Sequence, residues 1–233
     1  MNIIVGEPSQ RRELLDRILS TTNPHYRAHI KNYRRALAQR NALLKLGHAK
    51  QASDVFVWDV RLSELGGVIH QARKQLLEEF DKTFQSTYVD ISKKNDIVTI
   101  RYVSDETSAD YTTSLLAKLQ QNIQKDSERG FTSFGPHRDD LAVSINGSSA
   151  KTTASRGETR TLMLAIKLLE LQVIKSAKNT KPLLLLDDVF SELDGAHRRA
   201  LAEKTNDYQT IITTTEADAV IDHFSNKYDV IAL

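Results

Sequence analysis

The chain has 233 residues, of which 40% are hydrophobic and 27% charged, and it carries a formal net charge of +2 at pH 7. This length allows a substantial core in one or two domains, and the composition is ordinary for a globular protein. A nearly neutral charge gives no argument for nucleic-acid binding by the whole chain, so any such argument rests on local patches. The absence of cysteine excludes disulfides and thiolate metal sites and is consistent with a reducing compartment.

The N-terminal residues have neither a basic region nor a long apolar run, and no later segment is long enough to cross a membrane. The sequence also lacks internal repeats and low-complexity tracts. We therefore expect a cytoplasmic protein with no membrane partner.

Residues 1–94 are dominated by three predicted helices, over residues 8–20, 24–46 and 55–88. In the second helix, an apolar stripe from Tyr26 to Leu44 lies opposite five cations: Arg27, Lys31, Arg34, Arg35 and Lys45. No acidic residue occurs between Pro24 and Lys50. Two interpretations remain open at this point: an ordinary solvated helix face, or a patch for the phosphate backbone of DNA.

The third helix carries apolar residues at three- and four-residue spacing from Trp58 to Phe84, which predicts antiparallel packing against the second helix. Trp58 is expected in the core rather than as a platform for a stacked base. Gly66 and Gly67 in the middle of this helix are typical of a bend.

From residue 95 the pattern changes, so we expect a helical arm over residues 1–94 and an α/β domain over residues 95–233. Asn146-Gly147 is the strongest hairpin signal in the chain. The loop around His137 lacks the spacing of a metal site and is expected to be structural. Strands are predicted over 96–103, 131–134, 141–145, 150–153, 210–214 and 228–233, and helices over 110–129, 155–178, 196–205 and 216–224.

Residues 182–194 begin with proline and four consecutive leucines, which two aspartates follow. Such a run predicts a strand buried on both faces of a parallel sheet, with its carboxylates at the edge where α/β folds place ligands. There Asp187 is a candidate Mg²⁺ ligand, and Asp188 is a candidate to polarise a water. A buried strand that ends in an Asp-rich turn is the alternative interpretation.

Residues 155–158, Ser-Arg-Gly-Glu, open the helix that is predicted to end near Lys178. Ser155 and Glu158 have the spacing of a capping box, so the pattern indicates at least a well-started helix. With Gly157 in the first turn, the same helix end presents free N–H groups and a positive dipole to an anion. The two interpretations are compatible.

Taken together, this helix start, the leucine-aspartate strand and Ser191-Glu192-Leu193-Asp194 resemble the signature motif, Walker B motif and D-loop of ABC-type ATPases. The sequence more closely resembles the RecF family of bacterial recombination and repair proteins. The resemblance spans nearly the whole chain and implies an α/β fold, the C-terminal part of an ABC-type ATPase head, with a helical arm. The stretches that carry it are residues 8–16, 33–45, 135–141, 155–162, 186–194 and 211–215.

A P-loop of the form G-x-x-x-x-G-K-[ST] is absent, because none of the nine glycines is followed by lysine. In the RecF family that motif precedes the stretch matched by residues 7–9, so the chain is expected to match the family's C-terminal part. A fragment, a gene start set at an internal methionine and a truncated paralogue are open explanations. ATP hydrolysis by this chain alone is therefore not expected.

The resemblance implies that two ATPase heads enclose two ATP molecules, with ATP and Mg²⁺ as cofactors when a Walker A segment is supplied. It assigns Mg²⁺ binding to Asp187 and orientation of the attacking water to Asp188. Asp188 departs from the glutamate of most ABC ATPases but agrees with the RecF pattern. The residues implied at the nucleotide or at the dimer contact are Ser155, Arg156, Gly157, Glu158, Asp194, Thr213, Thr214 and Thr215.

In function, the resemblance implies a DNA replication and repair protein that binds DNA at single-strand/duplex junctions. It further implies an ATP-dependent homodimer that supports recombinase loading together with recombination-mediator proteins. The alternative is a non-enzymatic DNA-binding or protein-interaction module without ATP turnover. A head of a chromosome-maintenance ATPase is disfavoured, since no long coiled-coil heptads follow the arm.

Overall fold

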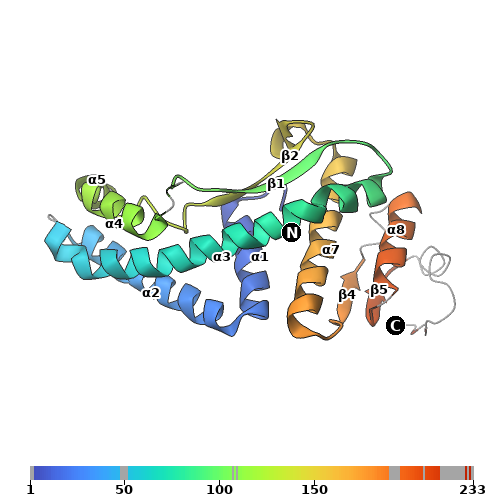
Figure 1. The fold of residues 1–233 in the computed structure, drawn as a ribbon, viewed down its shortest axis with the longest axis horizontal. Helices are drawn as coiled ribbons and strands as arrows, with labels where there is room; N and C mark the ends of the chain where they lie inside the picture. Colours follow the sequence, from blue (N-terminus) through green and yellow to red (C-terminus); the bar gives the residue numbers. More distant parts are fainter. Residues whose placement is uncertain are drawn as a thin grey trace. The chain divides into compact units, whose positions relative to one another are not determined.

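The computed structural model describes residues 3–47, 52–106, 108, 110–188, 195–206, 208–215, 229 and 231 (Figure 1). The helices are α1 (Pro8–Thr22), α2 (Pro24–Lys45), α3 (Ala52–Ser92), α4 (Tyr111–Gln121), α5 (Ile123–Arg129), α6 (Ala150–Thr153), α7 (Arg156–Lys178) and α8 (Gly195–Thr205). The strands are β1 (Val98–Val103), β2 (Asp140–Ile145), β3 (Ser148–Ser149), β4 (Leu184–Asp187) and β5 (Thr210–Thr213). Among these residues, no helix is both long enough and apolar enough to cross a membrane.

The chain divides into two compact units, which do not follow a single cut along the sequence. The first unit is Met1–Lys82 with Ile100–Val143, and the second is Thr83–Thr99 with Ser144–Leu233. The long helix α3 and the strands β1 and β2 therefore contribute residues to both units. The expected division between residues 94 and 95 differs from these bounds and stays a prediction.

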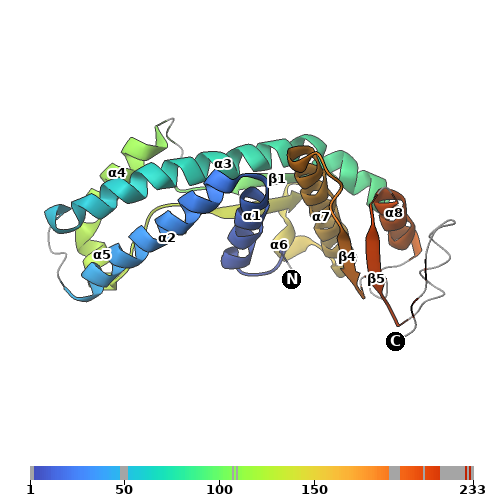
Figure 2. The ribbon, with the colours of Figure 1, turned by 90° about the horizontal axis from the view of Figure 1, so that it is seen from below.

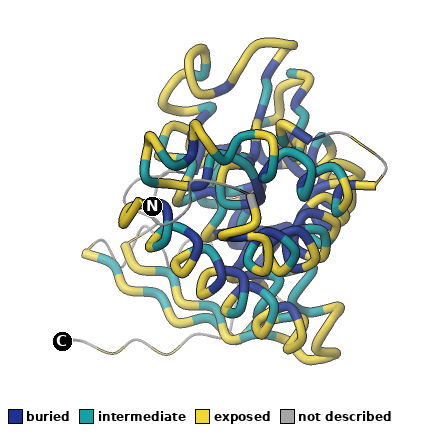
Figure 3. The backbone as a smooth tube through the Cα atoms, turned by 90° about the vertical axis from the view of Figure 1, so that its left-hand side faces the viewer, coloured by how far each residue is buried: buried dark blue, intermediate teal, exposed yellow. Residues whose placement is uncertain are grey.

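In the first unit, α2 and α3 run side by side in opposite directions (Figures 1 and 2). Their facing apolar side chains form one core cluster with residues of α4, as the spacing in both helices predicts. Along the helical turns of the backbone, buried residues alternate with exposed ones (Figure 3). Trp58 is partly buried and packs against this cluster, so the interpretation as a core residue is confirmed. The cluster contains Tyr26, Ile30, Tyr33, Ala36, Leu62, Leu65, Ile69, Tyr111, Leu115 and Leu119.

The two central glycines of α3 permit close approach of α4. A Cβ atom on Gly66 would lie 2.8 Å from Leu115 Cδ2, and one on Gly67 would collide with Thr112 Oγ1. The helix assignment is continuous through both glycines. This approach accounts for Gly66 and Gly67, and the bend expected from the sequence stays a prediction.

The hairpin predicted at Asn146-Gly147 is confirmed. β2 and β3 pair in antiparallel fashion, with Ile145 opposite Ser148. Asn146 and Gly147 have φ values of 50° and 80°, as a two-residue turn with left-handed twist at both positions requires. The three-stranded sheet has the order β1-β2-β3.

Three predicted elements are wrong. Residues 131–134 form no strand, because the N–H groups of Thr132 and Ser133 donate to the side chains of Asn41 and Asp126. Residues 150–153 are the short helix α6, in which the Ala154 N–H donates to the carbonyl oxygen of residue 150. The helix expected over residues 110–129 is two helices that meet at residue 122.

In the second unit, β4 and β5 form a two-stranded parallel sheet, with Leu185 opposite Ile211. Leu185 is 67% exposed and Ile211 53% exposed. The expectation that residues 182–188 are buried on both faces is therefore wrong for the described part of the chain. A strand is buried on both faces only where layers cover both faces of its sheet. Among the described residues, the face that carries Leu185 and Ile211 is exposed. The predicted helix over 216–224, most of the predicted strand over 228–233 and the D-loop stretch 191–194 lie outside the described residues.

Candidate functional site

The start of α7 has the geometry of a capping box. Ser155 Oγ accepts a hydrogen bond from the Glu158 N–H at 3.3 Å, and Glu158 Oε2 accepts one from the Ser155 N–H at 2.8 Å. Two amides of the helix end are satisfied in this way. The predicted helix cap is confirmed by this geometry.

The first turn of α7 leaves other amides for an external acceptor. Helix geometry gives the N–H groups of Arg156 and Gly157 no intrahelical acceptor. Both residues are exposed, and a Cβ atom on Gly157 would meet no atom within 4 Å. Together with the positive end of the helix dipole, this arrangement can accept an anion. The assignment of Ser155, Arg156, Gly157 and Glu158 to a nucleotide contact stays a prediction.

The carboxyl ends of β4 and β5 bring three predicted site residues together. Thr213 Oγ1 donates to Asp187 Oδ1 at 2.6 Å. The Asp188 N–H donates to the carbonyl oxygen and the hydroxyl oxygen of Thr213, at 3.1 and 3.2 Å. Parallel pairing of Asp187 with Thr213 causes this convergence, because equivalent ends of parallel strands meet at one sheet edge.

The remaining predicted site residues are less constrained. Thr214 is half-buried and Thr215 exposed directly after β5, whereas Asp194 lies outside the described residues. Within the described ranges, no group of three or more histidine, cysteine or carboxylate side chains has the arrangement of a metal site. The roles assigned to Asp187, Asp188 and the three threonines therefore stay predictions.

One contact of α7 was not anticipated from the sequence. Thr161 Oγ1 donates to the Gly157 carbonyl oxygen at 3.0 Å and lies 2.7 Å from His197 Nε2. Because the single hydroxyl proton goes to the carbonyl, the His197 ring donates to Thr161. This bond links α7 to the first turn of α8, and the only sequence signal for it was a threonine four residues after Gly157.

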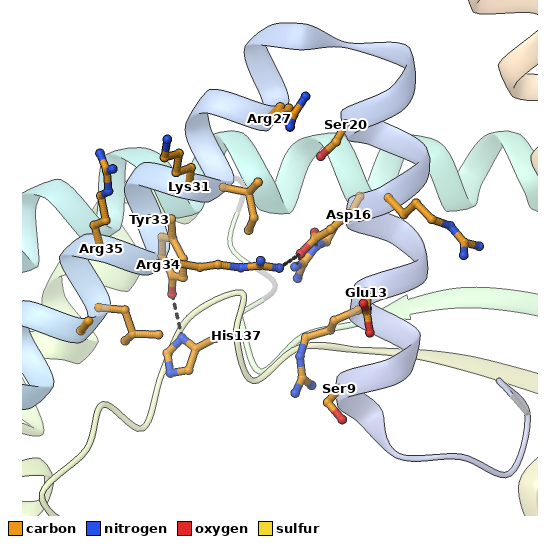
Figure 4. A pocket seen from close by; sticks show the side chains of 16 residues that line it. Ser9, Glu13, Asp16, Ser20, Arg27, Lys31, Tyr33, Arg34, Arg35 and His137 are labelled. Atoms are coloured by element: carbon orange, nitrogen blue, oxygen red, sulfur yellow. Dashed lines mark hydrogen bonds and ion pairs between the residues drawn. The ribbon is translucent and has the colours of Figure 1, made fainter. Parts of the chain in front are cut away.

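A cleft of about 910 Å³ lies between α1 and α2 in the first unit (Figure 4). Among the described residues, two carboxylates, Glu13 and Asp16, line it, and the cationic side chains outnumber them. Four of the five cations predicted on α2 are included, while Lys45 is not among the lining residues. The cationic lining residues are Arg12, Arg17, Arg27, Lys31, Arg34, Arg35 and Arg73.

Asp16 is the ionic centre of this cleft. Its Oδ1 accepts hydrogen bonds from Arg73 Nη2 at 2.8 Å and from the Tyr26 hydroxyl at 2.6 Å. Arg34 reaches across from α2 to Asp16 Oδ2 at 3.0 Å (Figure 4). Burial alone lowers the pKa of Arg73, but the neighbouring Tyr26 and Asp16 raise it by more than burial lowers it, so the net shift is upward. One carboxylate thus faces two guanidinium groups.

His137 lies at the same cleft, and the expectation of a structural loop agrees with its contacts. Its Nε2 lies 3.0 Å from the Thr132 carbonyl oxygen, which can only accept, so Nε2 carries the proton. Its Nδ1 accepts from the Tyr33 hydroxyl at 2.7 Å (Figure 4). Burial lowers the pKa of His137 to about 4, and Arg138 and Arg12 lower it further against a raising contribution from the Thr132 hydrogen bond. The ring is therefore a neutral, fixed part of the fold.

A sequence count of cations on α2 missed the role of Arg40. Its guanidinium is fully buried and donates to Asp59 at 2.6 Å, to Asp126 at 2.7 Å and to the Thr132 hydroxyl at 3.0 Å. A buried arginine needs such partners, and these bonds join α2, α3 and α5. Arg40 is thus a structural residue among surface cations.

Comparison with known proteins gives one consistent result. No protein-family model matches the chain. It is 35% identical over 216 residues to the DNA replication and repair protein RecF of Clostridium novyi, covering 92% of this chain and 60% of that protein. The RecF protein of Clostridium beijerinckii is 34% identical over 233 residues, covering 99% of this chain and 63% of that protein.

Solved structures agree with these relatives. The structure described as the recombination mediator protein RecF-ATPrS in the RecFOR pathway matches with a TM-score of 0.83 and 31% identity, over 93% of this chain and 60% of that one. A second RecF structure, with ATP, matches with a TM-score of 0.82. The fold is thus that of an ABC-type ATPase head with helical parts. The chain spans about three fifths of the length of the relatives it matches, and over nearly all of its own length it belongs to the RecF family.

Proposed function

We propose that this chain acts in DNA replication and repair in the manner of RecF, binding DNA and forming an ATP-dependent homodimer that supports recombinase loading at gapped DNA. The observation that carries the proposal is the alignment, which extends over 92% and 99% of the chain in relatives described as DNA replication and repair proteins. The partners in this proposal are DNA at single-strand/duplex junctions and recombination-mediator proteins.

The start of α7 supports the ATP-dependent part of the proposal. Its exposed amides and the open space at Gly157 suit the terminal phosphate of a nucleotide held by a second copy of the chain. In that dimer Ser155, Arg156, Gly157 and Glu158 lie at the partner's nucleotide, and Asp194 bridges the two copies. Thr213, Thr214 and Thr215 lie near the carboxylates.

The end of β4 fits a magnesium ion that is shared with a nucleotide. Mg²⁺ favours oxygen ligands and is usually held by one or two carboxylates together with phosphates and waters. Asp187 offers an exposed carboxylate whose Oδ1 is oriented by Thr213. Asp187 would hold the ion, which lowers the barrier by neutralising charge on the phosphates. Asp188 would orient the attacking water.

The DNA-binding part rests on the exposed cations of α2. Arg27, Lys31 and Arg35 are exposed, and none forms an ion pair with a described residue. Cations that neutralise backbone phosphates release counterions, so binding weakens steeply with salt. The charge reversal of Arg27 and Lys31 should therefore reduce the slope of log K against log salt by about two.

Fluorescence anisotropy with gapped, single-stranded and duplex DNA at several salt concentrations tests this part of the proposal. Lys74→Glu is the matched control, because Lys74 is an exposed cation of α3 in the same unit and does not line the cleft. An unchanged slope in the double reversal would reduce the α2 cations to a solvated helix face.

A second candidate function is a DNA-binding module without ATP turnover. The observation that favours it is the lack of a G-x-x-x-x-G-K-[ST] motif in the printed sequence, since that motif supplies the phosphate cradle. Steady-state phosphate release and sedimentation velocity with and without ATP distinguish the two candidates. Turnover that disappears in Asp187→Ala would reject the second candidate.

A further inference from the structure

Within the described part of the chain, the buried network around Arg40 joins one guanidinium to two carboxyl groups. Arg40 donates to Asp59 Oδ1 at 2.6 Å and to Asp126 Oδ2 at 2.7 Å, and all three side chains are fully buried. One guanidinium can neutralise only one carboxylate. We infer that Asp59 keeps a proton in the folded chain at pH values where an ordinary aspartate is ionised, which makes the contact between α2, α3 and α5 sensitive to pH. This inference goes beyond the proposed function and does not depend on it.

The sharing of the Arg40 guanidinium among several acceptors is the first support. The charged groups that act on Asp59 are Arg40 of α2 and Asp126 of α5. Arg40 also donates to the Thr132 hydroxyl at 3.0 Å and to the Leu119 carbonyl oxygen of α4 at 3.2 Å. Its donors are therefore divided between Asp59 and other acceptors, while Asp126 brings a second negative charge to the same core. Two like charges in a site of low dielectric disfavour the ionisation of one another.

The hydrogen bonds of the two carboxyl groups are the second support, because they distinguish Asp59 from Asp126. Both oxygens of Asp126 accept hydrogen bonds, Oδ2 from Arg40 and Oδ1 from the Ser133 N–H at 3.1 Å. Among the described residues, the buried Oδ2 of Asp59 has no hydrogen-bond partner. Hydrogen bonds to the ionised form favour that form, and an ionised oxygen without a partner is costlier to bury than a neutral one. The proton therefore belongs on Asp59.

The electrostatic balance at Asp59 agrees with this geometry. Burial is the largest influence and raises the pKa of Asp59, Arg40 lowers it through its charge and its hydrogen bond, Asp126 raises it, and the net shift from the ordinary value of 3.8 is upward. Above pH 3.8 the folded chain therefore holds a proton that the unfolded chain has lost. This contribution to stability is complete below the unfolded pKa and disappears as pH rises through the folded pKa. His137 acts in the opposite direction, because its pKa is lowered, so a variant is needed to isolate Asp59.

The test compares the urea midpoints of Asp59→Asn and the wild-type full chain at the same pH, between about pH 4 and pH 8. Asparagine resembles a protonated aspartate in shape and charge, and its oxygen can still accept from Arg40. The midpoint of the variant relative to the wild type should rise with pH, because only the wild type must ionise a buried group. Glu79→Gln, at an exposed carboxylate of α3 in the same unit, is the control and should give a flat difference. A difference for Asp59→Asn that is flat or falls with pH would overturn the inference.

The same substitution at the other carboxyl group should behave differently. In Asp126→Asn the amide nitrogen would face either the Arg40 donor or the Ser133 N–H, since both oxygens of Asp126 are acceptors. We expect a urea midpoint below that of the wild type and below that of Asp59→Asn at every pH. Equal midpoints for the two variants across the pH range would show that the network does not distinguish the two carboxyl groups, which contradicts the inference.

A direct measurement on the folded wild-type chain makes the test independent of variant stability. Carbon-13 NMR follows the side-chain carboxyl carbon of Asp59 through a pH titration, with its signal assigned from its absence in Asp59→Asn. A titration midpoint above the ordinary value of 3.8 supports the inference. A midpoint at or below that value would overturn it and would leave the proposed function untouched, since no step of that function involves Asp59.

Discussion

Two arginines on helix α2 carry the same charge but differ in their burial and in their ion pairs. Arg40 is fully buried and pairs with two carboxylates that are themselves fully buried. Arg35, five residues earlier, is exposed and lines the basic cleft. The buried network joins helices, whereas the exposed group leaves positive charge available to a ligand. Burial and pairing, rather than the number of cations, separate a structural charge from a binding charge.

We expect the largest loss of stability from a substitution in the buried network around Arg40. Arg40→Ala leaves Asp59 and Asp126 in the core without their cation, which should cost about 3–5 kcal/mol of the free energy of unfolding. Urea denaturation followed by circular dichroism measures the loss. Arg35→Ala on the same helix is the control and should change stability by less than about 0.5 kcal/mol. A loss below 1 kcal/mol for Arg40→Ala would contradict the structural role.

The next effect concerns His137, a neutral base beside the cleft. Its folded pKa is about 4, against an ordinary value of 6.5, so between these pH values the unfolded chain binds more protons. Stability should therefore fall as pH drops from 6.5 towards 4, by about 3 kcal/mol from this residue. His137→Gln should remove that part of the pH dependence in urea titrations at several pH values. An identical pH profile in the variant would show that His137 titrates normally.

A smaller effect on stability is expected at Ser155, at the exposed start of α7 in the second unit. Ser155→Ala removes the acceptor for the Glu158 N–H and should cost about 1 kcal/mol. Ser155→Asp should be nearly neutral, because aspartate caps helices as well as serine and its charge suits the helix dipole. Thermal melting of both variants measures this.

The variants Ser155→Ala and Ser155→Asp also distinguish a role in capping the helix from a role in contacting a nucleotide. A carboxylate that faces a phosphate repels it, so Ser155→Asp should abolish ATP-dependent dimerisation wherever the wild-type chain shows it, as sedimentation velocity records. Dimerisation by the Asp variant that matches the wild type would reduce residues 155–158 to a helix cap.

Sequence reasoning succeeded where a structure depends on neighbours along the chain. The α2 and α3 stripes, the turn at Asn146-Gly147 and the cap at Ser155 follow from periodicity and local hydrogen bonding, and each is confirmed. The family was also identified correctly, because several motifs occur in the same order along one chain.

Sequence reasoning failed where the structure depends on contacts between residues that are far apart along the chain. Residues 131–134 have a β-like composition, but their amides bond to side chains from other parts of the chain, which a local pattern does not contain. The burial of β4 depends on how many layers cover its sheet. The role of Arg40 depends on Asp59 and Asp126, which lie 19 and 86 residues away in sequence. That Arg12 of α1 and Arg27 of α2 line one cleft likewise depends on the three-dimensional arrangement.

The backbone conformation at Asp188 restricts which side chains this position can hold. With a φ of 48°, this residue is in the left-handed region, where aspartate and asparagine are tolerated far better than longer or branched side chains. Glutamate at this position would add a methylene and also strain the main chain that donates to Thr213. Asparagine keeps both the shape and the conformation while it removes the charge. Asp188→Asn is therefore the substitution that isolates the electrostatic contribution of this residue from its geometry.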